Sequence, residues 1–234
     1  MQETQNDATE HFEKMARDYD YWKNKNWYYY SALKSIAARY TAGRKNVLDA
    51  GCGTGDILLS LNVQNALGVD VSSAMIAIAK EKGLKKNNIS FLASEITTFS
   101  SSKKFDAILL FDVIEHLANP EKTIKSLSNL LTDSGIIILT MANPHWEPIL
   151  LLAEKLGLKM PEGPHYRISS KNLIAIAEKN KLKITNRDWF LLFPKYVFAV
   201  SWFLNSIIGR LPIIRRLAVI QLFIFGKLPA SGPL

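Results

Sequence analysis

Cysteine is nearly absent from this sequence, since Cys52 is its single cysteine in 234 residues. A lone cysteine excludes an intrachain disulfide framework and any zinc site built from cysteines. Residues 1–11 are polar and lack the apolar core of a secretory signal, so no signal peptide is expected. These absences are compatible with a protein that works in the reducing cytoplasm.

Acidic residues are scarce in the last third of the chain. Residues 1–149 hold 16 Lys and Arg against 17 Asp and Glu, a net charge of −1, whereas residues 150–234 hold 13 against 4, a net charge of +9. Such a basic segment predicts an anionic partner. No recognised nucleic-acid reader motif is present, so nucleic acid is not expected. Because this part of the chain is also apolar, an anionic membrane surface fits it better.

Glycine is concentrated where Gly51, Gly53 and Gly55 alternate directly after the apolar run 46–50. An apolar helical pattern follows at once. This order predicts a strand, a tight turn and a helix start, where backbone comes close to a ligand.

Acidic residues surround the glycines and indicate the charge of that ligand. Asp49 and Asp56 flank the loop, so a pyrophosphate would be repelled, whereas an ammonium or sulfonium group would be attracted. Asp70 ends a second apolar run 19 residues after Gly51, a spacing that suits ribose hydroxyls. The expected ligand is a cationic nucleoside.

Apolar runs of strand length alternate with helical patterns through the middle of the chain. The alternation predicts a parallel sheet covered by helices on both faces, with ligands at the carboxyl ends of its strands. The expected strands are 46–50, 66–70, 89–92, 105–112, 136–140, 182–192 and 217–225.

Residues 47–55 and 68–72 resemble the first and second motifs of the class I S-adenosylmethionine-dependent methyltransferases. The resemblance implies an α/β fold, a Rossmann-like doubly wound sheet of seven strands whose last strand is antiparallel. It implies S-adenosylmethionine as the cofactor. The residues implied to bind it are Asp49, Gly51, Cys52, Gly53, Gly55, Asp70, Val71, Glu95, Ile96, Phe111 and Asp112.

The segment before the glycine loop is expected to be helical and rich in aromatic side chains. Its pattern Phe12-x-x-x-Ala16-x-x-Tyr19-Asp20 is similar to the lid that methyltransferases of this type place over the cofactor. Residues 1–45 are therefore expected to form a lid and residues 46–234 the methyltransferase domain. The alternative is that the aromatic rings cover the outside of the sheet.

Three histidines are candidate catalytic residues: His116, His145 and His165. A hydroxyl acceptor needs a base, and histidine can serve at neutral pH. Some quinone-precursor O-methyltransferases carry Glu-x-x-Glu-His at the position of 112–116 and bind a magnesium-like ion there. Asp112 replaces the first Glu, so no metal is assigned, and Glu115 with His116 is expected to cap the next helix.

The stretch 190–208 is apolar but is not expected to cross a membrane. Pro194, Lys195 and Asn205 interrupt it, and spanning takes about 20 apolar residues. A crossing would also separate two strands that must share one sheet. Residues 195–212 are instead expected to form an inserted apolar helix that lies on a membrane, on a second copy in a homodimer, or on the domain itself.

The expected function is methyl transfer to a small or lipid-linked acceptor, through an oxygen nucleophile. Residues 146–151 and 153–159 resemble a subset of bacterial methyltransferases associated with surface glycan or lipid-linked sugar pathways. Two alternatives remain. One is a quinone-precursor or phospholipid methyltransferase, and the other is a non-catalytic cofactor-binding partner subunit.

Overall fold

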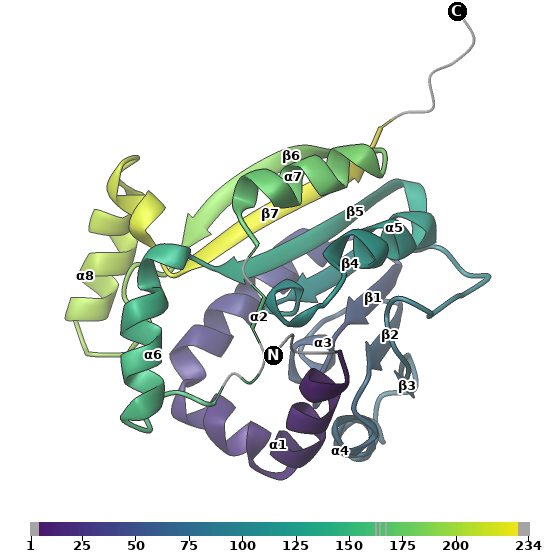
Figure 1. The fold of residues 1–234 in the computed structure, drawn as a ribbon, viewed down its shortest axis with the longest axis horizontal. Coiled ribbons are helices and arrows are strands. Elements are labelled where there is room, and N and C mark those ends of the chain that lie inside the picture. The colour runs from purple at the N-terminus through teal and green to yellow at the C-terminus, as the bar shows by residue number, and fades with distance from the viewer. Residues whose placement is uncertain (1–4, 162, 164, 167, 229–234) are drawn as a thin grey trace, which may run out of the picture.

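The computed structural model describes residues 5–161, 163, 165–166 and 168–228, and within them the chain forms one seven-stranded sheet (Figure 1). The strand order is β3-β2-β1-β4-β5-β7-β6. Strands β1 to β5 are parallel, and β7 lies antiparallel between β5 and β6. The fold class predicted from the sequence is confirmed. The strands are β1 Asn46–Ala50, β2 Asn65–Asp70, β3 Ile89–Ala93, β4 Phe105–Phe111, β5 Leu131–Ala142, β6 Leu182–Phe190 and β7 Ile220–Lys227.

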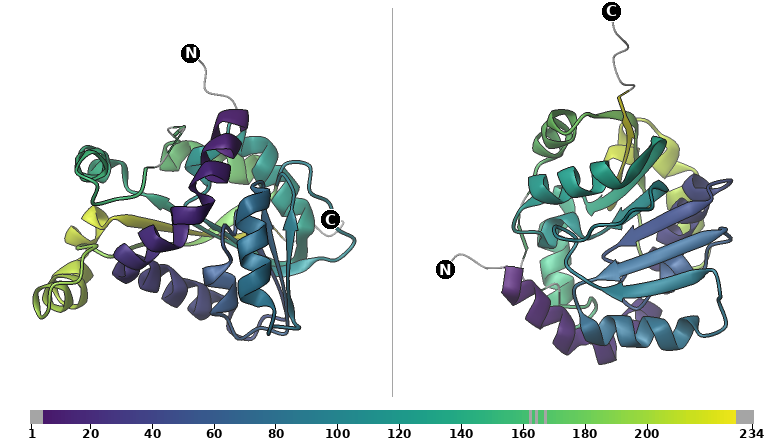
Figure 2. Two further views of the ribbon diagram at one scale, coloured as in Figure 1. Left: turned by 90° about the horizontal axis from the view of Figure 1, so that it is seen from below. Right: turned by 90° about the vertical axis from the view of Figure 1, so that its right-hand side faces the viewer.

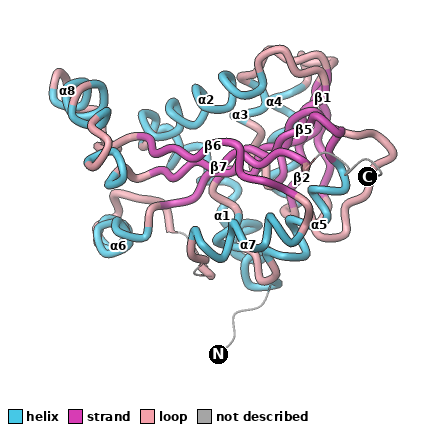
Figure 3. Tube along the Cα trace, turned by 90° about the horizontal axis from the view of Figure 1, so that it is seen from above, coloured by secondary structure: helices cyan, strands magenta, loops and turns pink. Residues whose placement is uncertain are grey.

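Helices cover both faces of the sheet (Figure 3). Helices α5 and α7 contribute side chains such as Leu127 and Leu173 to one apolar core, while α2, α3 and α4 contribute Ile36, Leu58 and Ile76 to the other. Because both faces are covered, β4 is a nearly continuous apolar run rather than an alternating one. The helices are α1 Gln5–Lys25, α2 Trp27–Thr41, α3 Asp56–Leu59, α4 Ser73–Gly83, α5 Pro120–Leu130, α6 Glu147–Lys155, α7 Ser170–Lys179 and α8 Val200–Ser206.

The aromatic N-terminal segment is helical throughout its described length, in α1 and α2. Helix α2 buries Leu33 and Ile36 against the sheet, whereas α1 packs against α4 (Figure 2). Two contacts join α1 to the glycine loop: Asp20 accepts a 2.6 Å hydrogen bond from the Thr54 hydroxyl, and Lys23 Nζ lies 3.2 Å from the same oxygen. The segment is therefore attached to the carboxyl edge of the sheet.

The inserted segment between β6 and β7 contains a shorter helix than the sequence suggested. Helix α8 spans seven residues, and 3-10 turns at Ile208–Arg210 and Ile214–Leu217 follow it. Gly209 and Pro212 explain the interruption, because glycine and proline disfavour a continuing helix. The second turn includes Leu217, the expected first residue of the last strand, and the strand begins at Ile220 instead. No helix in the described part of the chain is long and apolar enough to cross a membrane.

Candidate active site

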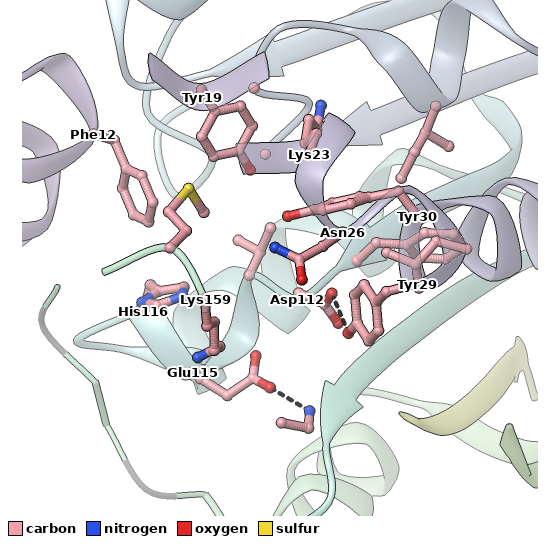
Figure 4. Close-up of a pocket in the computed structure, with 18 of the residues that line it drawn as sticks. Phe12, Tyr19, Lys23, Asn26, Tyr29, Tyr30, Asp112, Glu115, His116 and Lys159 are labelled. Carbon is pink, nitrogen blue, oxygen red and sulfur yellow. Dashed lines mark hydrogen bonds between the residues drawn. The ribbon is translucent and has the colours of Figure 1, made fainter. Parts of the chain in front are cut away.

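A cavity of about 440 Å³ opens at the carboxyl ends of β1, β2 and β4 (Figure 4). Side chains of α1 and α2 line one side of it, and those of α6 and the 193–195 segment line another. The sheet edge supplies Asp49, Asp70 and Asp112. The cavity therefore lies where the strand pattern predicted a ligand site.

The glycine loop forms the floor of this cavity. Gly51 and Gly53 have φ values of +82° and +53°, a region that side chains rarely adopt. The N–H of Gly53 donates to Asp70 Oδ2 at 2.8 Å, and the N–H of Ser72 donates to Oδ1 at 2.9 Å. Each Asp70 oxygen keeps a lone pair for a further donor. The loop and Asp70 thus form one rigid cradle.

Gly55 has a different place from the other two glycines and does not line the cavity. It precedes α3 with φ +79°, and a Cβ there would lie 2.8 Å from the Phe91 ring. Gly55 therefore affects the shape of the turn through its close packing against Phe91 and not by facing the cavity.

The two acids that flank the loop differ in their surroundings. Asp56 forms ion pairs with Lys23 and Lys82, which lower the pKa of its carboxyl despite partial burial. The expectation that Asp49 and Asp56 act as a pair on the ligand is therefore corrected. Asp49 lines the cavity, and no described residue donates a hydrogen bond to its carboxylate. Burial raises the pKa of Asp49 to about 7.

The end of β3 and the turn after β2 supply the next wall. Cys52, Val71, Glu95 and Ile96 all line the cavity. Glu95 accepts a hydrogen bond from the Thr97 hydroxyl, and Ile96 is buried. All four therefore face the same cavity as the glycine loop.

The end of β4 carries a strained acid whose partners the sequence did not reveal. Asp112 has φ +53°, and its carboxylate accepts hydrogen bonds from the Tyr29 hydroxyl at 2.7 Å and the Thr140 hydroxyl at 2.8 Å (Figure 4). Burial raises the pKa of Asp112. Phe111 lines the cavity beside it. Helix α2 is therefore joined to the mouth of the site.

Glu115, His116, Lys159 and His165 form the opposite, titratable wall of the cavity (Figure 4). Glu115 Oε1 accepts a 2.8 Å hydrogen bond from the N–H of Ala142, and its buried Oε2 has no hydrogen-bond partner among the described residues. Burial raises the pKa of Glu115 to about 8, and burial lowers the pKa of Lys159 to about 8. The ring centroids of His116 and His165 lie 5.3 Å apart. No sequence pattern pointed to Lys159.

His145 is not part of this wall. Its ring nitrogen lies 2.9 Å from Asn143 Oδ1, and the ring does not line the cavity. The structure therefore brings His116 and His165 together and keeps His145 apart. Within the described residues, no group of three or more His, Cys, Asp or Glu side chains is arranged to hold a metal ion.

The model of a family described as methyltransferase domain matches residues 11–186 of this chain. That span includes the glycine loop, Asp70 and the ends of β3 and β4. The chain belongs to this methyltransferase family.

Curated relatives match a little more than half of this chain. An uncharacterised protein of Methanocaldococcus jannaschii is 37% identical over 136 residues, which are 57% of this chain and 51% of that one. The ubiquinone biosynthesis O-methyltransferase of Coxiella burnetii is 29% identical over 140 residues, 57% of this chain and 60% of that one. The chain thus spans between half and three-fifths of these relatives.

Solved structures share the fold at low sequence identity. The N-methyltransferase NodS of Bradyrhizobium japonicum, in complex with S-adenosylhomocysteine, has a TM-score of 0.66 at 16% identity and covers 94% of this chain and 98% of that one. A putative methyltransferase of Haloferax volcanii, in complex with the Trm112 activator, has a TM-score of 0.70 at 14% identity and covers 97% and 100%.

The cavity fits the expected cofactor, S-adenosylmethionine, on three observations. S-adenosylmethionine is a cationic nucleoside, and Asp49 offers a buried carboxylate with no protein donor among the described residues. Asp70 keeps acceptor capacity beside the loop. The floor has no room for side chains, because a Cβ at Gly51 would lie 2.4 Å from Val113 and a Cβ at Gly53 would lie 3.1 Å from the Tyr19 ring.

Proposed function

We propose that the methyltransferase transfers a methyl group to a hydroxyl oxygen of a small or lipid-linked acceptor that carries an apolar portion. The observation that carries the proposal is the composition of the cavity beyond the cofactor cradle. Helix α6 contributes the apolar side chains Ile149, Leu150 and Ala153 to the cavity. Three polar side chains line the same cavity: Glu115, His116 and His165. An apolar wall with a few titratable groups suits an acceptor that is mostly apolar and reacts through a polar atom.

In the cradle we assign roles by chemistry. Asp70 would accept hydrogen bonds from the ribose hydroxyls, and Glu95 would accept one from the adenine amino group. Ile96 would pack on the adenine face. Asp49 would neutralise the ammonium of the cofactor. Cys52, Val71, Phe111 and Asp112 would contribute shape and backbone, as would Gly51 and Gly53, while Gly55 would act indirectly by shaping the turn.

Helix α1 is the proposed lid over the cofactor. Its side chains Phe12, Tyr19 and Lys23 line the cavity, and Glu13 fastens it to the start of α4. The carboxylate of Glu13 accepts from the Ser73 hydroxyl at 2.8 Å and from the N–H of Ala74 at 3.1 Å. These contacts would hold the aromatic rings over the bound nucleoside and exclude water.

When bound, S-adenosylmethionine supplies an electrophilic methyl group on a sulfonium sulfur. The chain's own residues would align the acceptor hydroxyl with that group and keep water out, which are the main contributions a protein makes to such a transfer. His116 would accept the hydroxyl proton as the oxygen attacks. His165, which meets its ring edge to face, would hold that ring in place.

Cofactor binding should strengthen as pH rises through about 7, because the Asp49 carboxyl ionises there. Only the ionised form attracts an ammonium, so the affinity for S-adenosylmethionine should rise about ten-fold from pH 6 to pH 8. Asp49→Asn should flatten this rise. Calorimetry at several pH values measures it, with neutral methylthioadenosine as the control ligand. A wild-type pH slope that persists in Asp49→Asn would remove Asp49 from this role.

A quinone precursor or a phospholipid is the alternative acceptor. One curated relative is named a ubiquinone biosynthesis O-methyltransferase, and its match covers more than half of this chain. A different alternative is a non-catalytic cofactor-binding subunit. The Haloferax volcanii neighbour was solved with an activator protein, so a chain of this fold can work within a complex.

Labelled S-adenosylmethionine tests the acceptor class. The purified protein would be incubated with methyl-labelled cofactor and with separated lipid, glycan and polar extracts of the host. We expect label in the lipid or glycan fraction, in a product whose methyl group is lost under ether-cleaving conditions. Label on nitrogen would contradict the oxygen acceptor, and absence of label in every fraction despite cofactor binding would favour the non-catalytic subunit.

A lipid-linked acceptor would bring the enzyme to a membrane surface. On this proposal it works as a peripheral protein on the cytoplasmic face, attracted by the excess of basic residues in its C-terminal part.

A further inference from the structure

Exposed large hydrophobic side chains are concentrated at one end of the molecule. Of the twenty found in the described part of the chain, fifteen lie between Ile149 and Leu217. Phe198 is 82% exposed, Trp202 63% and Ile213 83%. Scattered apolar residues are normal on a soluble protein, but a concentration of this kind marks an interaction surface.

These side chains belong to two segments that lie at that end of the molecule, α6 with residues 156–158, and residues 196–217 around α8 (Figures 1 and 3). Contacts join the segments at both ends of α6. The Trp146 indole donates to the Leu217 carbonyl, and Lys195 Nζ lies 3.4 Å from the Leu158 carbonyl oxygen. We call this surface the α6–α8 face. Its exposed apolar residues are Ile149, Leu151, Leu152, Leu156, Leu158, Tyr196, Val197, Phe198, Val200, Trp202, Phe203, Ile207, Leu211, Ile213 and Leu217.

The charged residues of the α8 part of the face, 196–217, are all basic, whereas α6 carries Glu147 and Glu154 beside Lys155. Asp188 is the last acidic residue in the sequence, so residues 189–234 contain basic side chains and no acidic ones. Arg210 and Arg216 are exposed in the turns that follow α8, and Lys155 is exposed on α6. Apolar side chains flanked by cations are the composition that binds anionic lipid interfaces.

The same elements form the wall of the cavity. On α6, Ile149 and Leu150 line the cavity while Leu151 and Leu152 are exposed outside it. In the other segment, residues 193–195 line the cavity and Phe198 is exposed close by in the chain. The wall between the outer face and the interior is therefore apolar on the α6 side and carries one cation, Lys195, on the other.

We propose that the α6–α8 face docks on an anionic lipid bilayer and that the acceptor enters the cavity from the bilayer between α6 and residues 193–195. The entry route rests on the proposed lipid-linked acceptor, whereas the docking rests on the surface itself. Side chains of α6 and α8 would enter the headgroup region, and Arg210 and Arg216 would meet lipid phosphates.

A second copy of the chain fits this face less well than a bilayer. A two-fold symmetric dimer would bring the face against itself. The face carries Lys155, Arg210, Arg215 and Arg216 against Glu147 and Glu154, so two copies would bring a surplus of positive charge together. An anionic lipid surface supplies the opposite charge.

Vesicle flotation tests the docking. We expect the full chain to float with vesicles of phosphatidylcholine and phosphatidylglycerol in equal parts, to bind pure phosphatidylcholine vesicles far less, and to be released by high salt. Leu152→Glu and Trp202→Glu, both at exposed positions, should each abolish flotation. Arg210→Gln should weaken binding roughly five-fold. The matched controls are Leu84→Glu, at a site that is 77% exposed on another side, and Lys103→Gln, and both should float like the wild type.

A fluorescent label reports the depth of insertion. Cys52 is buried, so Trp202→Cys creates an accessible thiol that can be labelled with an environment-sensitive dye. Its emission should shift to the blue on anionic vesicles, and a label at Leu84→Cys should not shift. Flotation that Leu152→Glu and Trp202→Glu leave unchanged would overturn the proposal, and so would a wild-type protein that never floats. A dimer in sedimentation that Trp202→Glu dissociates would assign the face to a second copy instead.

Activity separates this inference from the proposed function. Methyl transfer should be measured with an acceptor from the labelled fraction, once dispersed in detergent and once in vesicles. Trp202→Glu should lower the rate at least ten-fold in vesicles and leave the detergent rate unchanged. Flotation without labelled lipid or glycan would leave the docking in place and refute the acceptor class. Labelled lipid without flotation would support the acceptor class and refute the docking.

Discussion

Gly53→Val is expected to abolish S-adenosylmethionine binding while leaving the protein folded. Gly53 has φ +53°, and its N–H donates to Asp70. A β-branched residue in this region is strained by about 1–3 kcal/mol, and relief of the strain would turn that N–H away from the carboxylate. The added side chain would also press on the Tyr19 ring and occupy the floor of the cradle. We expect a loss of affinity on the order of 100-fold or more.

Gly43→Val is the matched control for that prediction. Gly43 also has a positive φ, +75°, but an added Cβ there meets nothing within 4 Å. Both variants should lose thermal stability to a similar degree, since both are strained. Only Gly53→Val should lose the cofactor in calorimetry. If the two variants bind alike, the glycine loop is not the cofactor cradle.

His116→Ala is expected to lower kcat on the order of 10²–10⁴-fold with cofactor and acceptor both saturating. General-base catalysis contributes an effect of this size, and His116 lies in the titratable wall of the cavity. Added imidazole should restore part of the rate, which a purely structural role would not allow. His145→Ala should leave kcat unchanged, because that ring is outside the cavity.

A carboxylate base or a metal ion in place of His116 would give a different result in the same assay. If Glu115 is the base, the rate should rise with pH until about 8, where its carboxyl ionises, and Glu115→Gln should remove that rise. If a metal ion takes part, EDTA should stop turnover and magnesium should restore it. Full activity in His116→Ala would exclude His116 from the chemistry.

The fold was predictable because its signals are local. Apolar runs bounded by glycines and helix caps appear directly in the sequence, and Ser72 caps α4 by accepting a hydrogen bond from the N–H of Met75. The antiparallel direction of the last strand was implied by the family resemblance rather than by the pattern. The apolar segment 195–212 misled, because apolarity at helical spacing does not reveal that Gly209 and Pro212 break the helix after Ser206.

The glycine-loop side of the cavity could be placed from the sequence for a similar reason, since Asp49 to Gly55 and Asp70 with Val71 lie in two short motifs. The acceptor side could not. Asp112 meets Tyr29 across 83 positions of sequence. Lys159 reaches Glu115 and Asp112 from the loop after α6, and no pattern marks it. The position of Asp56 beside the glycines suggested a ligand-binding acid, but Asp56 instead forms an ion pair with Lys23 on α1. In all three cases the partner of the acid lies in a distant segment of the chain. The spacing of residues along the sequence does not reveal such contacts.

The polar fastening of α1 has a consequence for repeated turnover. Glu13, Asp20 and Lys23 hold this helix by hydrogen bonds and ion pairs, whereas the α6–α8 face is apolar. Opening the cavity at α1 therefore breaks polar contacts, whereas opening it at the α6–α8 face separates apolar side chains. Loosening α1 at Glu13 and Asp20 would open the cofactor side, while Lys25 at the end of the helix could keep its hydrogen bond to the Gly157 carbonyl after α6. An enzyme resting on a bilayer through that face would be processive, methylating one acceptor after another during a single residence on the membrane.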